Sequence, residues 1–313
     1  MDTLSSVLPV IILLLIGVLC RKKRLIEESG IGSLQSLVMN ITLPVGLFLT
    51  FFNASLTADT LAFPLTIFAV NALGYPLGKL LCRLFRRKDP FLPFAMTTSE
   101  DGMLGYALLA MIILESRMTA FALMDLGQVL GFFAVTYQIL NKQLTGEKAS
   151  LRSIVKSIVT NPLLVGMLAG ILCSATGLSA LAESAGLMPL IESLCSFISA
   201  PTNAVILIVI GYRINFSHLK PGELLMAMLM RMLQQGLLCA AVLTLFRFLG
   251  GVFAEPVTTV SVLAIMMLPG TYLLPMYVEP DERKEFYATF LSAYTLLSVA
   301  AFIVLKLLTA GRL

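Results

Sequence analysis

The stretch Thr97–Leu109, TTSEDGMLGYALL, places charged residues inside a long apolar run of this chain. Two adjacent carboxylates, Glu100 and Asp101, are followed closely by Gly102 and Gly105. Glycine weakens a helix, and a carboxylate away from water needs a polar partner. The fold therefore has to explain why two acids and two glycines stand together in such apolar surroundings.

The composition indicates an integral membrane protein. Hydrophobic residues make up 58% of the 313 residues, charged residues make up 13%, and the mean hydropathy is +0.92. Soluble domains contain about 25% charged residues. A basic cluster follows the first apolar run instead of preceding it, so we expect this run to be a membrane helix and not a cleavable signal peptide.

Apolar runs of roughly 17–25 residues cross a bilayer as helices. The sequence predicts an all-α polytopic protein with ten spans, at Ser5–Cys20, Leu34–Phe52, Leu61–Leu81, Phe91–Leu114, Thr119–Leu140, Ile158–Gly177, Leu190–Gly211, Leu224–Leu249, Pro256–Tyr277 and Phe286–Leu308.

The distribution of lysine and arginine orients these spans, because short cytoplasmic loops carry an excess of both. Among the 22 such residues, those at the end of or after even-numbered spans are Arg117, Arg247, Lys306 and Arg312. Arg231 lies inside span eight, and all others follow odd-numbered spans. The pattern predicts a multi-pass protein of the cell membrane with both termini outside the cytoplasm. This topology explains the net charge of +4, and no nucleic-acid partner is expected.

Two pairs of segments indicate an internal repeat. Span one, LPVIILLLIGVLC from Leu8, shares the spacing of Pro, Gly and Cys with span six, NPLLVGMLAGILC from Asn161. Span two, LQSLVMNITLPVGLFL from Leu34, matches span seven, IESLCSFISAPTNAVI from Ile191, in its Ser-Leu, Ile and Pro. A unit of five spans crosses an odd number of times, so its second copy is inverted. We expect one repeat over 1–140, a short cytoplasmic linker over 141–157 and a second repeat over 158–313.

This arrangement answers the opening question. Counted from the start of span four, Glu100 and Asp101 lie about 15 Å deep, in the middle of a hydrocarbon core of about 30 Å. A carboxylate there costs several kcal/mol unless it faces water, a partner or a ligand. Gly102 and Gly105 would let the helix open, and open backbone at that depth is tolerated only where it lines a cavity.

Span nine has a corresponding break. Pro269 removes a backbone donor, and Gly270 weakens the next turn. Interrupted helices at corresponding places in two inverted halves mark the midplane site of secondary transporters. Tyr106 and Tyr272 follow the breaks at similar distances, where each serves either a ligand or packing. In the alternative interpretation, span four starts later and its acids cap the helix at the cytoplasmic surface.

Further polar residues fall within the spans. Asp125 in span five either lines the site or makes a structural hydrogen bond. Arg231 either extends to the membrane surface or acts as a counter-ion for the acidic pair or for a substrate carboxylate. Among the intramembrane amides, Asn40 and Asn203 are predicted to line the site, because prolines nearby favour irregular backbone.

We expect no metal, cofactor or enzymatic site. The five cysteines are scattered through apolar runs, and the one histidine, His218, lies in a polar loop. The chain has no serine–histidine pairing and no Gly-x-Gly-Asp motif of an intramembrane enzyme.

Three segments carry a resemblance to a known family. They are Leu8–Phe48, LPVIILLLIGVLCRKKRLIEESGIGSLQSLVMNITLPVGLF; Met124–Phe133, MDLGQVLGFF; and Ser157–Cys173, SIVTNPLLVGMLAGILC. They resemble the auxin efflux carrier family, whose first helix, basic turn and second helix with Leu-Pro follow in this order. The short loop from Asn141 to Ser157 is similar to the bacterial branch.

The resemblance implies ten helices in two inverted five-helix repeats, with spans four and nine broken and crossing at the centre. It also implies a scaffold half, a transport half that moves by an elevator-like mechanism, and homodimers as in the plant members. The substrates it implies are organic anions, such as auxin in plants and malate- or malonate-like dicarboxylates in bacteria.

The chain departs from the family pattern at span four. Glu100 stands near the family's asparagine position and Ala107 near its proline position, so the break would rest on glycines alone. An acidic pair repels an anionic substrate unless it is neutralised, and burial beside a like charge favours a protonated carboxyl. Such a pair suits proton coupling through Glu100, Asp101, Asp125 or Arg231. It equally suits a cationic, zwitterionic or neutral substrate.

Three functions compete. The leading one is a secondary transporter of a small organic solute, most of all an organic anion, coupled to protons. The second is a cation/proton antiporter that binds sodium or a proton at the acidic pair. The third is a membrane sensor that binds a lipid or solute without transporting it.

Overall fold

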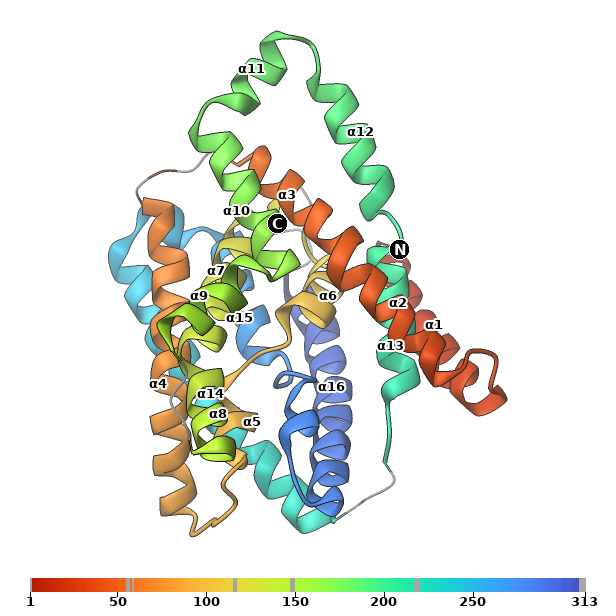
Figure 1. The fold of residues 1–313 in the computed structure, drawn as a ribbon, viewed down its shortest axis with the longest axis vertical. Coiled ribbons are helices and arrows are strands. Elements are labelled where there is room, and N and C mark those ends of the chain that lie inside the picture. The colour runs from red at the N-terminus through yellow and green to blue at the C-terminus, as the bar shows by residue number, and fades with distance from the viewer. Residues whose placement is uncertain are drawn as a thin grey trace.

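The computed structural model describes residues 2–54, 57, 59–114, 117–146, 150–216 and 220–309. Over these ranges the chain is helical and contains no strand (Figure 1). Lys148, His218 and Arg312 lie outside the described residues.

One set of helices forms what we call the first group. It consists of α1 (Asp2–Lys23), α2 (Glu28–Leu37) continued through the π-helical turn η1 (Val38–Thr42) into α3 (Leu43–Phe52), α10 (Pro162–Ala175), α12 (Met188–Ser199) and α13 (Thr202–Arg213). Within it α1 packs along α13, and α10 packs along α3. Both pairs approach closely at glycines: Gly17 lies against the backbone of Ile208, and Gly166 lies against the backbone of Pro44.

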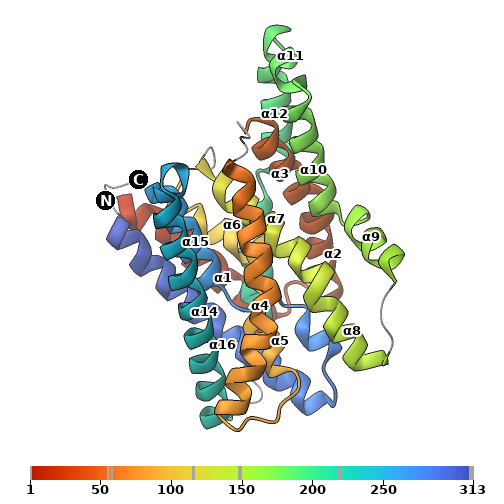
Figure 2. The same cartoon turned by 90° about the vertical axis from the view of Figure 1, so that its left-hand side faces the viewer.

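The other helices form the second group. It consists of α4 (Ala62–Leu84), α5 (Leu92–Thr97), η3 (Asp101–Gly105) with α6 (Tyr106–Leu109), α7 (Thr119–Gly131) continued through η5 (Phe132–Thr136) into α8 (Tyr137–Thr145), α14 (Pro221–Leu249), α15 (Pro256–Met267), η7 (Leu274–Tyr277) and α16 (Asp281–Thr309). Short elements connect the rest: η2 (Asp59–Leu61), α9 (Leu151–Val159), α11 (Leu178–Ser184) and η6 (Gly251–Ala254). Figure 2 shows α4 and α14 side by side at one face of this group.

Six helices are long and apolar enough to cross a membrane. They are Glu28–Phe52, Asp59–Leu84, Thr119–Thr145, Met188–Arg213, Pro221–Leu249 and Asp281–Thr309, and they coincide with the expected spans two, three, five, seven, eight and ten. Pro256–Met267 is a shorter apolar helix, and α1 coincides with span one. The count of ten spans and the inverted repeat remain predictions.

The expected span six, Ile158–Gly177, begins too early. Ile158 lies in α9, and the chain bends by 75° before α10 starts at Pro162. Asn161 causes this start: its side-chain oxygen accepts hydrogen bonds from the backbone N–H groups of Leu163 (2.9 Å) and Leu164 (3.2 Å). Proline at the first helical position completes the start signal.

The expected spans four and nine are both broken. In span four, α5 ends at Thr97 and the chain is extended at Thr98, so the break precedes Gly102 and Gly105 instead of lying at them. The two glycines sit in the π-helical turn η3. In span nine, α15 ends at Met267 and the break includes Pro269 and Gly270, as predicted.

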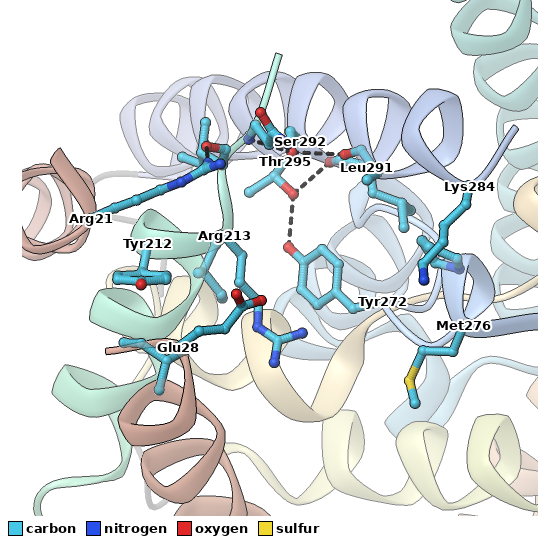
Figure 3. A pocket seen from close by; sticks show the side chains of 16 residues that line it. Arg21, Glu28, Tyr212, Arg213, Tyr272, Met276, Lys284, Leu291, Ser292 and Thr295 are labelled. Atoms are coloured by element: carbon cyan, nitrogen blue, oxygen red, sulfur yellow. Dashed lines mark hydrogen bonds between the residues drawn. The ribbon is translucent and has the colours of Figure 1, made fainter. Parts of the chain in front are cut away.

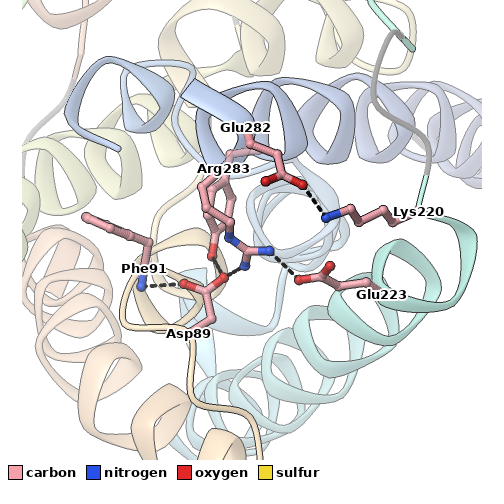
Figure 4. A network of polar contacts seen from close by, with 7 residues as sticks. Asp89, Phe91, Lys220, Glu223, Glu282 and Arg283 are labelled. Atoms are coloured by element: carbon pink, nitrogen blue, oxygen red, sulfur yellow. Dashed lines mark hydrogen bonds and ion pairs between the residues drawn. The ribbon is translucent and has the colours of Figure 1, made fainter. Parts of the chain in front are cut away.

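A charged network joins the loop after α4 to the first turns of α14 and α16 (Figure 4). Arg283, in the first turn of α16, pairs with Asp89 from the loop after α4 and with Glu223 at the start of α14. The Tyr287 hydroxyl donates to the Asp89 carboxylate at 2.6 Å. Arg283 also lies over the Phe286 ring, 4.7 Å from its centroid. These contacts hold three helix ends in one arrangement.

Candidate functional site

The two breaks meet at a crossover. The backbone N–H of Glu100 donates to the carbonyl of Pro269 at 3.0 Å. In return, the N–H of Thr271 donates to the Thr98 hydroxyl at 3.1 Å. The N–H of Tyr272 donates to the Glu100 carboxylate at 2.7 Å. Each broken segment thus supplies acceptors for backbone N–H groups of the other, and Glu100 takes part in both directions.

A face of α14 caps the broken helices. Arg231 donates to the carbonyls of Ala95 (2.6 Å) and Thr98 (2.8 Å) at the end of α5, and to that of Leu268 (2.7 Å) at the end of α15. One turn on, Gln234 and Gln235 donate to carbonyls of the same α5 turn or of α4 at 2.7–3.2 Å. The last carbonyls of a helix lack internal partners and carry partial negative charge, so a buried cation satisfies them.

This geometry corrects one interpretation of Arg231, and its role as a counter-ion stays a prediction. Its side chain is 0% exposed, so it does not extend to the membrane surface. Its guanidinium lies 5.0 Å from the Tyr294 ring centroid and binds backbone carbonyls. In the described part of the chain it forms no ion pair with an acid.

Three carboxylates are buried at the crossover. Glu100 is 9% exposed, Asp101 2% and Asp125 1%. The Ser99 hydroxyl donates to Asp101 Oδ2 at 2.9 Å, and the Tyr106 hydroxyl donates to Asp125 Oδ2 at 2.8 Å. The other Asp101 oxygen, Oδ1, is buried without a hydrogen-bond partner. The acids are therefore buried inside the protein, and their depth in the membrane stays a prediction.

An inner cavity of about 430 Å³ reaches the crossover from the side of the basic loops (Figure 3). Arg21 and Arg213, at the ends of α1 and α13, line one wall, and Lys284 of α16 lines the other; Glu28 is its one carboxylate. Tyr272 also lines this cavity, and its hydroxyl is hydrogen-bonded to Thr295 Oγ1 at 2.7 Å. The cavity thus lies between the two groups and carries excess positive charge.

An outer cavity of about 350 Å³ reaches the crossover from the opposite ends of the helices. Its first-group wall includes Thr42, Glu192 and Asn203, and its second-group wall includes Tyr106 and Thr119. Tyr106 lies at the crossover, where its ring packs edge-on against Phe121. The two tyrosines that follow the breaks therefore line different cavities.

The structure gathers most, but not all, of the predicted residues. Asn203 lines the outer cavity. Asn40 is exposed and donates to the Ser36 hydroxyl at 2.8 Å, so it is not brought to the crossover. Gly105 packs tightly: a Cβ there would lie 2.7 Å from the Phe121 ring and 2.9 Å from Leu268.

Sequence reasoning missed the cations of the inner cavity. In the sequence, Arg21, Arg213 and Lys284 are loop charges that indicate only the topology. No local pattern distinguishes them from the other loop cations, because what sets them apart is a shared cavity between distant helices. Gln234 and Gln235 were likewise not predicted at the site, although with Arg231 they share one face of a helix at spacings of three and four.

The chain is similar to a transporter. It is 23% identical over 274 residues to an uncharacterized transporter of Methanothermobacter thermautotrophicus, a match that covers 85% of this chain and 87% of the relative. No protein-family model matches the chain. The relative and the apolar helices together indicate a multi-pass membrane protein.

Proposed function

We propose that this protein is a secondary transporter of the auxin efflux carrier type, which moves a small organic anion across the cytoplasmic membrane. In this proposal residues 1–140 and 158–313 are inverted repeats of five helices, and both termini lie outside the cytoplasm. The packing of α1 on α13 and of α10 on α3 supports the repeat, because span one pairs with span seven as span six pairs with span two.

The observation that carries the proposal is the pair of cavities. They lie at opposite ends of the helices, both between the two groups, and their linings include Tyr272 and Tyr106, which follow the two breaks. Alternating access requires one site that is reached from either side in turn. Sliding of the second group along the first would widen one cavity at the expense of the other, which is an elevator-type movement.

The charge of the inner cavity supports an anionic substrate. Arg21, Arg213 and Lys284 face a space of about 430 Å³. Guanidinium and ammonium groups bind carboxylates by charge-assisted hydrogen bonds. The positive cavity collects the anion, and the acids deeper in the crossover accept the coupled proton.

The test uses purified protein. A thermal-shift screen against mono- and dicarboxylates, amino acids and cations identifies the ligand, and uptake of that ligand into proteoliposomes under a pH gradient measures transport. We expect Arg213→Gln and Lys284→Gln to weaken apparent affinity roughly tenfold each, equivalent to about 1.4 kcal/mol. Lys142→Gln is the matched control, because Lys142 is an exposed cation at the end of α8 that lines neither cavity. Uptake that is absent for every tested carboxylate would contradict the proposal.

A cation/proton antiporter is the second candidate, favoured by the buried Glu100, Asp101 and Asp125. Dequenching of a pH-sensitive dye on addition of sodium or potassium, without any organic solute, would identify it. In the described residues, no group of three or more His, Cys, Asp or Glu side chains is placed to hold a metal ion. We therefore rank this function second.

A further inference from the structure

Three carboxylates and one cation share the buried crossover. Glu100, Asp101 and Asp125 are at most 9% exposed. Arg231 donates hydrogen bonds to the carbonyls at the ends of α5 and α15. An uncompensated charge at membrane depth costs several kcal/mol. Uptake of positive charge by the acids removes part of this cost.

Hydrogen bonding gives the three acids different roles. Glu100 accepts from the N–H of Tyr272 and ties the two broken segments together. Asp125 accepts from the Tyr106 hydroxyl. Asp101 accepts from Ser99 through Oδ2, whereas its Oδ1 is the one buried carboxylate oxygen in the described residues that has no partner.

An unpartnered oxygen of a side chain that is 2% exposed is suited to bind a proton. A proton needs a single lone pair, whereas a metal ion needs several ligands, and no group of three or more His, Cys, Asp or Glu side chains in the described residues is placed to supply them. We propose that Asp101 is the proton-binding carboxyl of this transporter and that Glu100 has a structural role, joining the two broken segments at the crossover. The part of this inference that concerns transport rests on the proposed function.

The surroundings of Asp101 connect it to both cavities. Its charged and titratable neighbours are Glu100 beside it, Tyr106 on α6, Asp125 on α7 and Arg231 on α14. Arg213 of α13 acts on Glu100 from the inner cavity. On the outer side, Tyr106 lines the cavity and donates to Asp125, and both groups interact electrostatically with Asp101. The proton adds to one Asp101 oxygen, and the carboxylate becomes a neutral acid.

The test reads the carboxyl directly and needs no substrate. Infrared difference spectra of the lipid-reconstituted protein, taken between acidic and alkaline buffer, report the C=O stretch of a protonated buried carboxyl, identified by its shift in heavy water. We expect this band in the native protein, its loss in Asp101→Asn, and its retention in Glu100→Gln and Asp125→Asn. Asp101→Glu should keep a band at a shifted frequency, which covers the case in which Asp101→Asn fails to fold.

The outcomes separate this inference from the proposed function. A native protein without the band, a band that survives Asp101→Asn, or a band lost equally in Glu100→Gln or Asp125→Asn would overturn the assignment to Asp101. Absence of carboxylate uptake in proteoliposomes, with the band lost only in Asp101→Asn, would overturn the transport function and leave the proton site standing. Uptake driven by a pH gradient in the native protein and not in folded Asp101→Asn is the expected joint result.

Discussion

Gly270 shows how closely the broken segments approach. A Cβ at this position would lie 2.8 Å from the Ala95 carbonyl oxygen, which also accepts a hydrogen bond from Arg231. At Gly102 a Cβ would lie 3.6 Å from its nearest neighbour, the Leu163 side chain. Two glycines that look equivalent in the sequence therefore differ: one is required by contact with backbone, and the other has room for a methyl group.

We predict that Gly270→Ala lowers the free energy of unfolding by about 1–3 kcal/mol, the usual cost of overpacking. The backbone at Ala95 cannot move without breaking the carbonyl contact with Arg231. Gly102→Ala is the control and should be tolerated. Thermal midpoints in detergent compare the two variants, and equal midpoints would show that the crossover is looser than the structure indicates.

At the scale of elements, α14 holds the crossover together. Arg231, Gln234 and Gln235 occupy successive positions on one face of this helix and satisfy carbonyls of α4, α5 and α15. A break in a membrane helix leaves polar backbone groups in an apolar medium, where each unsatisfied group costs several kcal/mol. Side chains of the continuous helix α14 thus satisfy backbone groups that the breaks after α5 and α15 would otherwise leave without partners.

Arg231→Gln should therefore destabilise the protein by about 3 kcal/mol or more, since it strands several buried carbonyls. Arg231→Lys should recover only part of this loss, because a single ammonium cannot match the planar fork of a guanidinium. Arg247→Gln, an exposed cation at the end of the same helix, is the matched control. Chemical or thermal unfolding in detergent measures all three, and an Arg231→Gln protein as stable as the control would contradict the capping role.

The charged network at the other end of α14 makes a second prediction for elements. Arg283→Met should lower stability by about 1.5–3 kcal/mol, the range for hydrogen bonds to charged groups, because Arg283 bridges Asp89 and Glu223. Lys220→Gln removes an exposed pair with Glu282 in the same network and should change the unfolding midpoint little. Midpoints measured at low and high salt test both, and a larger effect for Lys220 than for Arg283 would refute the ranking.

At the scale of the whole molecule, the cavities separate two sets of helices. Met276 of η7 lines the inner cavity and is 72% exposed, and Ser196 of α12 lines the outer one. In a background with the five native cysteines replaced, we predict that Met276→Cys reacts with an impermeant maleimide only from the cytoplasmic side. Ser196→Cys should react only from outside.

A ligand or pH that favours one orientation should change the two labelling rates in opposite directions. Rates that rise or fall together would indicate general loosening and would contradict alternating access. Labelling of Ser196→Cys from the cytoplasm would invert the proposed topology.

Some parts of this arrangement can be predicted from the sequence and others cannot, and a physical reason separates the two. The similar expected depth of Glu100, Asp101, Pro269 and Gly270 follows from counting along a helix of known rise, whereas the meeting of the two breaks was implied only by the family resemblance. The place of the break at Thr98 could not be predicted, because the partners of this segment lie some 170 positions away: the contact from Tyr272 to Glu100 spans 172 residues. For the same reason, the contacts of Arg231 with backbone carbonyls could not be predicted from the sequence.

The double attachment at the crossover limits how the protein can move. Glu100 holds Tyr272, and Arg231 holds the ends of both α5 and α15. Separating the two segments would leave these polar groups without partners in an apolar interior. Moving both segments together breaks none of the contacts between them. In the proposed transport cycle, the two broken segments therefore move as one unit together with α14, and a substrate bound at the crossover moves with them.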